Sequence, residues 1–206
     1  MDATKLLMQD HQEVEDLFKK FEAASDRALV STRQDLVDKI IVRLAIHAEI
    51  AEEVFYPAVK SQVGAAKDAV LEAVEGLHVA ETLMEKIKGL AAEDETFGAK
   101  VTVLIDIVRH HKDEEEQQMF PLVREALPAE QLETLGRRLE RAQSQAADEK
   151  LDQGFFPRGL SCTVALLVGR AGRLPGTWAL GWLGDRVNIA RAPRRKPDGA
   201  STPSPR

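Results

Sequence analysis

Apolar residues recur every three or four positions through the first 127 residues, which is the spacing of one buried stripe on an amphipathic helix. Four such stripes, separated by short polar segments, predict helices near residues 4–24, 31–57, 65–90 and 96–122. Pro128 begins a shorter amphipathic helix at about residues 129–147. Helices joined by short connections pack antiparallel to their neighbours. The pattern therefore predicts an all-α fold, an up-down antiparallel four-helix bundle over residues 1–127 with a short accessory helix in residues 128–150.

The phase of the third stripe decides which polar side chains enter the bundle. The apolar stripe is broader here than in the other three helices. We place Leu71, Val74 and His78 on its inner side. Either Glu81 or Thr82 is expected beside them, one turn further along the helix. Three further apolar residues flank this line: Leu77, Met84 and Ile87.

Each of the four predicted helices carries one histidine on its stripe: His11, His47, His78 and His111. A single histidine in such a position is usually an ordinary core or interface residue. Four of them at matching positions can converge at one depth in an antiparallel bundle, where imidazoles without partners would cost free energy. Coordination of a cation satisfies their lone pairs. The pattern therefore favours a metal site inside the bundle.

Two segments of the chain, residues 47–57 and 111–121, follow the same plan. Each runs from a histidine through an acidic stretch and two large apolar residues to a proline at the tenth place. Two such segments indicate a duplicated helical unit. Because Pro57 and Pro121 lack a backbone donor, they should kink or loosen each helix near its end.

Glu115 lies four residues after His111 and therefore one turn further along the same helix face. The stripe places Glu115 inward and its neighbours Glu114 and Glu116 outward. A buried carboxylate is prohibitively costly unless a cation compensates its charge. The alternative is that all three glutamates form a solvated face. Imidazole together with carboxylate suits iron, manganese or zinc, and the spacing does not choose among them.

Charge divides the chain into an acidic body and a basic tail. Residues 1–150 hold 19 Lys and Arg against 31 Asp and Glu, a net −12, whereas residues 151–206 hold 9 against 3, a net +6. An acidic body without a basic patch argues against nucleic acid as the main partner. The tail contains 6 of the 9 prolines and 8 of the 13 glycines but no helical stripe, so we expect it to be disordered.

Cysteine usage and the first residues of the chain bear on its compartment. The single cysteine, Cys162, cannot form an internal disulfide, and the first residues lack the basic and apolar regions of a signal peptide. We therefore expect a cytoplasmic protein. No apolar run approaches the roughly 20 residues that span a bilayer, so no membrane partner is expected.

These motifs resemble those of the bacterial hemerythrin-like proteins, the HHE cation-binding family. The resemblance covers roughly residues 1–127 and rests on Asp10-His11, residues 47–57, His78-Val79-Ala80 and residues 111–121. It implies a four-helix bundle that holds a non-haem di-iron centre, with histidines on the outside of the pair and helix carboxylates bridging the irons. Five residues match the ligand positions of the family: His11, His47, His78, His111 and Glu115.

The chain departs from the family at the carboxylate of the first repeat. Ala51 stands where the family has a glutamate, and alanine cannot bridge two ions. Glu52 is the closest replacement and would turn inward in a locally bulged helix, while Glu49 and Glu81 are the alternatives. The expected cofactor is iron, with either one or two ions per chain. Thr82 stands where oxygen-carrying hemerythrins have another histidine, which argues against dioxygen carriage.

Three functions are consistent with these residues. We favour a metal-binding protein that senses or buffers iron or oxygen species, with dioxygen, peroxide or nitric oxide as its ligand. The second is an enzyme that decomposes peroxide, and the third is a metal-free helical interaction module. His110 lies about 100° around the helix from His111 and is expected at the surface. Tyr56 is expected to pack inside the bundle, the alternative being that its hydroxyl approaches the metal.

Overall fold

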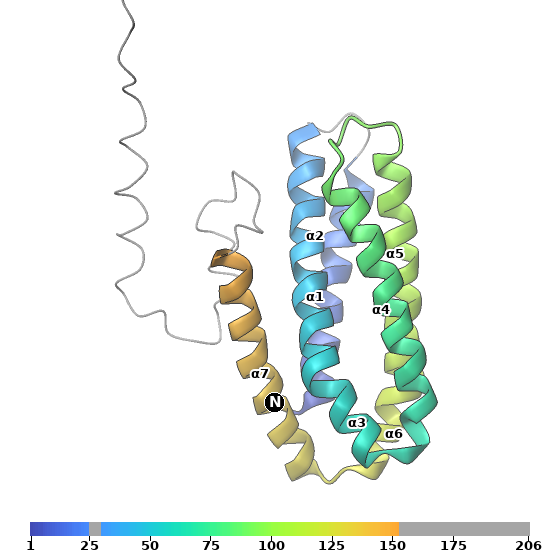
Figure 1. Ribbon diagram of the computed structural model, residues 1–206, viewed down its shortest axis with the longest axis vertical. Helices are drawn as coiled ribbons and strands as arrows, with labels where there is room; N and C mark the ends of the chain where they lie inside the picture. Colours follow the sequence, from blue (N-terminus) through green and yellow to red (C-terminus); the bar gives the residue numbers. More distant parts are fainter. Residues whose placement is uncertain (25–29, 153–206) are drawn as a thin grey trace, which may run out of the picture. The chain divides into compact units, whose positions relative to one another are not determined.

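The computed structural model describes residues 1–24 and 30–152 (Figure 1). The tail for which disorder is predicted therefore lies, from residue 153 onward, outside the described residues. The elements are, in order, α1 (Ala3–Ala23), α2 (Val30–Ile50), η1 (Ala51–Phe55), α3 (Tyr56–Gln62), η2 (Gly64–Ala66), α4 (Lys67–Lys88), α5 (Phe97–Glu114), η3 (Glu115–Met119), α6 (Phe120–Ala126) and α7 (Ala129–Asp152). Of the segments labelled η, η1 and η3 are turns of π-helix and η2 is a 3-10 turn.

The bundle consists of α1, of α2 continued through η1 into α3, of α4, and of α5 continued through η3 into α6 (Figure 1). α1 packs against α2 and α4 packs against α5, while α7 packs along both α1 and α2. The predicted all-α antiparallel bundle with an extra helix is confirmed. The extra helix is longer than the apolar pattern predicts, because α7 extends to Asp152.

Both repeats contain a turn of π-helix that ends two residues before their proline. In η1 the backbone N–H of Tyr56 bonds to the carbonyl of Ala51, and in η3 that of Phe120 bonds to the carbonyl of Glu115. The next residue in each repeat is proline, which has no N–H to offer. The loosening predicted at these prolines therefore takes the form of one widened turn, and the helix continues beyond it.

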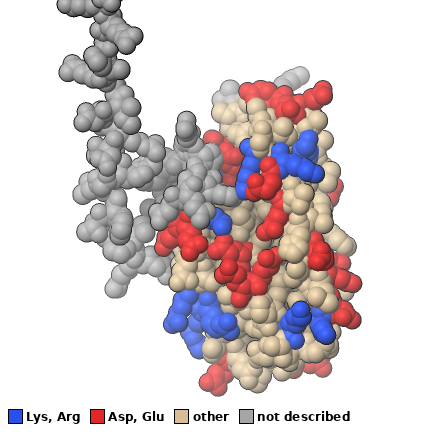
Figure 2. All heavy atoms as spheres, viewed as in Figure 1, with Lys and Arg blue, Asp and Glu red and all other residues tan. Residues whose placement is uncertain are grey.

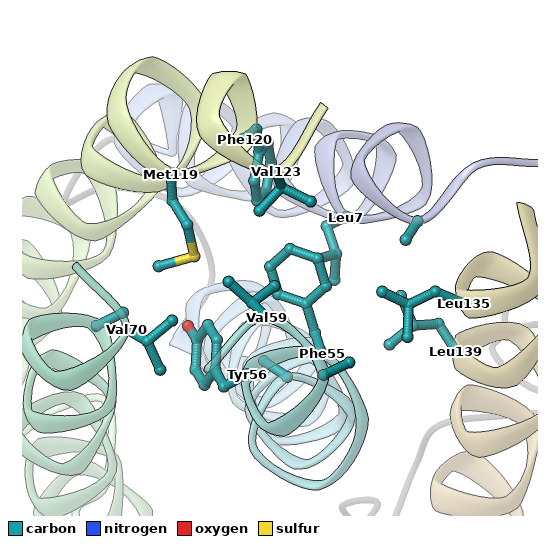
Figure 3. Close-up of a cluster of buried hydrophobic side chains, with 14 of the residues drawn as sticks. Leu7, Phe55, Tyr56, Val59, Val70, Met119, Phe120, Val123, Leu135 and Leu139 are labelled. Carbon is teal, nitrogen blue, oxygen red and sulfur yellow. The ribbon is translucent and has the colours of Figure 1, made fainter. Parts of the chain in front are cut away.

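Apolar side chains form two large clusters along the bundle. The first cluster joins α3, α6 and α7 to the start of α1 and includes Leu7, Phe55, Tyr56, Phe120 and Leu139 (Figure 3). The second includes Val14, Phe18, Ile40, Phe97 and Leu104. On α1, His11 comes between Leu7 of the first cluster and Val14 of the second. The histidine positions of the bundle therefore lie between two apolar clusters.

The phase predicted for the third helix is wrong by about one residue. The buried residues of α4 are Val70, Ala73, Leu77, Ala80, Met84 and Ile87. Leu71, which the pattern places inward, is 46% exposed, and His78 also faces outward. Apolar residues occur at neighbouring positions along this helix, so the sequence contains two overlapping stripes about 100° apart. The stripe that faces the bundle is the one with the small side chains Ala73 and Ala80.

Acidic side chains are spread over the visible face of the helical body, and the basic ones form separate small groups (Figure 2). This distribution agrees with the negative charge of residues 1–150. Within residues 1–24 and 30–152, none of the helices combines the length and the apolar character that crossing a membrane requires.

Candidate metal centre

The buried carboxylate of Glu115 is the point on which the interior histidines converge. Glu115 begins η3 and is 0% exposed. Its Oε2 lies 3.0 Å from Nε2 of His11, 4.0 Å from Nε2 of His47 and 3.7 Å from Nε2 of His111. These three histidines are themselves buried. Helices α1, α2 and α5 thus each direct one imidazole nitrogen at the same carboxylate oxygen.

The charges of this group are balanced inside the bundle. Burial alone would raise the pKa of Glu115, but the contact with His11 and the positive charge available on the three histidines lower it to about 2. Burial alone would lower the pKa of His11, yet the carboxylates of Glu115 and Glu116 raise it. The two carboxylates face different nitrogens of His11, Glu115 at Nε2 and Glu116 at Nδ1, and both favour a proton on the ring. A cation bound there would replace that proton, because a ligating nitrogen must be deprotonated.

Glu116 sets the orientation of the His11 ring. Its Oε1 lies 2.7 Å from Nδ1 of His11, so this nitrogen is the one that donates and Nε2 is the one that faces Glu115. A carboxylate behind a ligating imidazole fixes its tautomer and raises its basicity. The sequence pattern places Glu116 outward. The π-helical turn changes this, because widening the helix lets two consecutive glutamates face the interior.

The hydroxyl of Tyr56 completes the surroundings of Glu115. It donates a hydrogen bond to Glu115 Oε1 at 2.8 Å and lies 3.3 Å from Nε2 of His111. Burial and the negative charge of Glu115 raise the pKa of Tyr56 well above its ordinary value, so the phenol keeps its proton. The predicted packing of Tyr56 inside the bundle is confirmed, and its hydroxyl reaches the carboxylate on which the histidines converge.

A second group of possible ligands lies at the side of the bundle. Glu52 Oε1 is 3.6 Å from Nε2 of His78, and Glu81 offers an oxygen close enough that the three ligand atoms lie within 4.8 Å of one another. The side chain of His78 is 52% exposed, in contrast to its predicted interior position, because α4 is rotated relative to the expected phase. Burial and the charge of Glu81 raise the pKa of Glu52.

The remaining candidates occupy other positions. Ala51 is 0% exposed at the place that Glu115 takes in the second repeat, so no carboxylate enters the interior there. Glu49 pairs with Lys150 of α7 at 2.6 Å and does not join the histidines. The hydroxyl of Thr82 bonds to the backbone carbonyl of His78 on the surface. His110 is exposed and pairs with Glu114, as its expected surface position implies.

The interior group has the chemistry of a cation site. Both ring nitrogens of His47 are buried and make no hydrogen bond. Nε2 of His11 and Oε2 of Glu115 lie 3.0 Å apart but outside hydrogen-bond geometry. One ligand atom each from His11, His47 and Glu115 lie within 4.8 Å of one another. Buried polar atoms without partners are costly, and a cation held between them satisfies them together. Two or three imidazoles with one carboxylate fit iron, manganese or zinc.

A small apolar cavity adjoins these histidines. It has a volume of about 30 Å³, and its lining includes His11, His47 and His111. Its lining also includes apolar side chains, among them Phe18, Leu44, Met84 and Ile107. Gly76 borders it on α4, where a Cβ would come to 3.4 Å from Nδ1 of His111. A space of this size holds one or two water-sized molecules.

This chain is similar to proteins of known sequence or structure. A DNA nickase of Nostoc sp. strain PCC 7120 is 30% identical over 144 residues, which are 70% of this chain and 40% of that protein. This chain therefore spans about two fifths of that relative's length. The crystal structure of a hemerythrin HHE cation binding domain-containing protein from Mycobacterium kansasii superposes with a TM-score of 0.65 at 21% identity, covering 75% of this chain and 92% of that one, and thus shares the fold. The sequence profile of the hemerythrin HHE cation binding domain matches residues 2–123, and the chain accordingly belongs to the hemerythrin HHE cation-binding domain family.

Proposed function

We propose that this protein binds non-haem iron in its bundle and uses it to bind, sense or buffer an oxygen species or iron itself. The observation that carries the proposal is the convergence of three imidazole nitrogens on one buried oxygen of Glu115. A carboxylate that is buried and ionised among imidazoles has little structural purpose without a cation, because well-packed apolar side chains would stabilise the bundle at lower cost.

Two ion positions are proposed, of unequal strength. The interior position is formed by His11, His47 and Glu115, with His111 beside the same carboxylate. The peripheral position is formed by Glu52, His78 and Glu81. The interior ligands are buried and fixed by neighbouring carboxylates, whereas the His78 side chain is half exposed. We therefore expect the interior position to fill first and the peripheral position to bind more weakly.

The proposed ligand is a small molecule such as dioxygen, peroxide or nitric oxide. Iron, when bound, would supply the ability to bind such a molecule and to change its oxidation state. The residues of the chain would supply the surroundings. The apolar cavity beside the histidines has room for a molecule of this size. The phenol of Tyr56 keeps its proton and donates a hydrogen bond to the carboxylate of Glu115.

Peroxide decomposition is the second candidate, and Tyr56 is the observation that favours it. A neutral, buried phenol next to the proposed ion position can donate a hydrogen bond to a bound peroxide. DNA nicking, the activity named for the Nostoc relative, is not favoured, since residues 1–150 carry a net −12 and DNA binding needs a basic surface. A cytoplasmic location and iron as the metal are part of the proposed function.

Anaerobic loading of the full chain with Fe(II) tests the proposal. We expect one to two irons per chain by elemental analysis and a new near-ultraviolet or visible band after exposure to dioxygen, peroxide or nitric oxide. Repeated turnover of peroxide would favour the enzymatic function over sensing. His111→Ala should eliminate the tighter, interior class of iron sites, whereas His110→Ala, one residue away on the surface, should not. Normal iron stoichiometry in His111→Ala would contradict the assignment.

A further inference from the structure

The helix α7 lies outside the family match over residues 2–123, yet it is built into the bundle. Leu135 and Leu139 point from α7 toward Phe55 and its neighbours in the first apolar cluster (Figure 3). Gly136 lies so close to the backbone of Met1 that a Cβ at this position would collide with it. The position of α7 against α1 is thus fixed by apolar packing and by a close approach of backbones.

One polar side chain of α7 reaches toward the interior histidines. Nε2 of Gln143 donates a hydrogen bond to Oδ1 of Asp10 at 2.8 Å. The other oxygen of Asp10, Oδ2, lies 3.8 Å from Nδ1 of His47, and the Asp10 side chain is only 11% exposed. Both Asp10 Oδ2 and His47 Nδ1 are buried and make no hydrogen bond. Asp10 Oδ2 and His47 Nδ1 therefore face each other, and each can compensate the buried polarity of the other.

The arrangement behind His47 parallels the one behind His11. His11 has Glu116 on its Nδ1 side at 2.7 Å and Glu115 on its Nε2 side. His47 has Asp10 on its Nδ1 side and the same Glu115 on its Nε2 side, at longer distances. At 3.8 Å the carboxylate acts on His47 as a nearby charge, so its effect depends on how firmly its position is held. Gln143 is the side chain that holds it.

We infer that Gln143 is a positioning residue for the metal centre, acting through Asp10 on His47. By fixing Oδ1 of Asp10, it aims Oδ2 at Nδ1 of His47. A carboxylate there favours the tautomer with its proton on Nδ1 and its lone pair on Nε2, which is the nitrogen directed at Glu115. The helix beyond the family's domain thereby prepares a ligand inside it. The inference rests on the proposed metal function for its consequence, although the tautomer itself exists without metal.

Gln143→Leu tests the inference, because leucine keeps the size of the side chain and removes the donor. Lys150→Ala is the matched control, since it breaks another short bond between α7 and α2, the one to Glu49 at 2.6 Å, without touching Asp10. Asp10→Asn, alone and combined with Gln143→Leu, completes a double-mutant cycle. If Gln143 acts through Asp10, its substitution should have little further effect in the Asp10→Asn background.

The first readout is metal affinity, measured by titrating Co(II) into the metal-free full chain against a chromophoric chelator. We expect Gln143→Leu to weaken binding about 10- to 100-fold, the usual effect of losing a group that orients a ligand. The ligand-field spectrum of bound Co(II) should change as well. Lys150→Ala should keep the affinity and the spectrum of the wild type. Wild-type affinity in Gln143→Leu, or equal losses in both variants, would overturn the inference.

The second readout needs no metal. Nitrogen-15 NMR of the histidine rings reports which ring nitrogen of His47 carries the proton. We expect protonated Nδ1 in the metal-free wild type and in Lys150→Ala, and a mixture of tautomers in Gln143→Leu. A wild type that fails to bind metal but shows this difference would overturn the proposed function and leave Gln143 as a positioning residue. An unchanged His47 tautomer in Gln143→Leu would contradict the role of Gln143 whatever the metal content.

Discussion

The two repeats have the same backbone plan and differ in what each widened turn presents to the interior. η1 and η3 stand at equivalent places, five residues long and directly before the residue that precedes each proline. The first residue of each turn is fully buried, and it is Ala51 in the first repeat and Glu115 in the second. Only the second repeat therefore brings a carboxylate into the bundle at this position.

The glutamate at the second place of each turn approaches a different histidine. Glu116 of the second repeat approaches His11, and together with Glu115 it surrounds that buried imidazole with two carboxylates. Glu52, the equivalent of Glu116, approaches His78, which stays half exposed at the side of the bundle. The three buried imidazoles thus all lie beside the interior carboxylate of Glu115, whereas His78 on α4 lies beside Glu52 at the side of the bundle.

Replacing Glu115 should have the largest effect on metal binding, because it removes the interior carboxylate that distinguishes the second repeat from the first. In Glu115→Gln the interior ion position loses its carboxylate ligand. The affinity for the first ion should therefore fall by more than about 100-fold, which exceeds the effect of losing an orienting group. Elemental analysis after loading with Fe(II) and dialysis measures this. Glu114→Gln, the neighbouring glutamate that pairs with His110 at the surface, is the control and should retain its iron.

Ala51→Glu should make the first repeat resemble the second. A carboxylate at this buried position could bind iron together with the nearby histidines, and the iron would neutralise its charge. Iron content should therefore rise toward two per chain. The metal-free variant should lose about 2 kcal/mol of unfolding free energy or more, because the new charge is buried without a cation. Urea denaturation with and without iron measures both changes. An iron content lower than that of the wild type would show that position 51 does not adjoin the ions.

Single histidine variants should separate the two ion positions. His11→Ala removes an interior ligand and should eliminate the tighter class of sites in an Fe(II) or Co(II) titration. His78→Ala should remove only the weaker class, since its side chain belongs to the peripheral group with Glu52 and Glu81. Equal losses of both classes in the two variants would mean that the ions form one indivisible centre.

Tyr56→Phe should have the smallest effect. The change removes the hydrogen bond to Glu115 but keeps the ring among its apolar neighbours. A hydrogen bond to a charged group contributes about 1.5–3 kcal/mol, so the metal-free protein should be destabilised by roughly that amount while iron content stays normal. Thermal unfolding of the metal-free variant checks the first part, and elemental analysis checks the second. Loss of iron in this variant would indicate that the phenol itself is a ligand.

The sequence pattern predicts the bundle well because three of its four stripes have one clear phase. On α1, α2 and α5 the histidine falls in line with buried residues, so His11, His47 and His111 are found where periodicity places them. On α4 neighbouring apolar residues form two stripes, and packing against the other helices decides between them. That choice depends on the shapes of all the helices, which the local pattern of one helix does not contain.

The details of the metal centre depend on features that periodicity cannot express. A π-helical turn shifts every later side chain around the axis, so Glu116 faces inward although a regular helix places it outward. The contact of Tyr56 with Glu115 joins residues of different repeats. Gln143 reaches Asp10 across more than a hundred residues of chain, and neither residue type signals the other. The prolines at the ends of the repeats were the only local indication of irregular turns.

Anomalous diffraction from crystals of the iron-loaded protein tests the central claim most directly. We expect a strong iron peak at coordination distance from Nε2 of His11, Nε2 of His47 and an oxygen of Glu115. A bundle interior without an iron peak, or iron found only at the peripheral group on the surface, would contradict it.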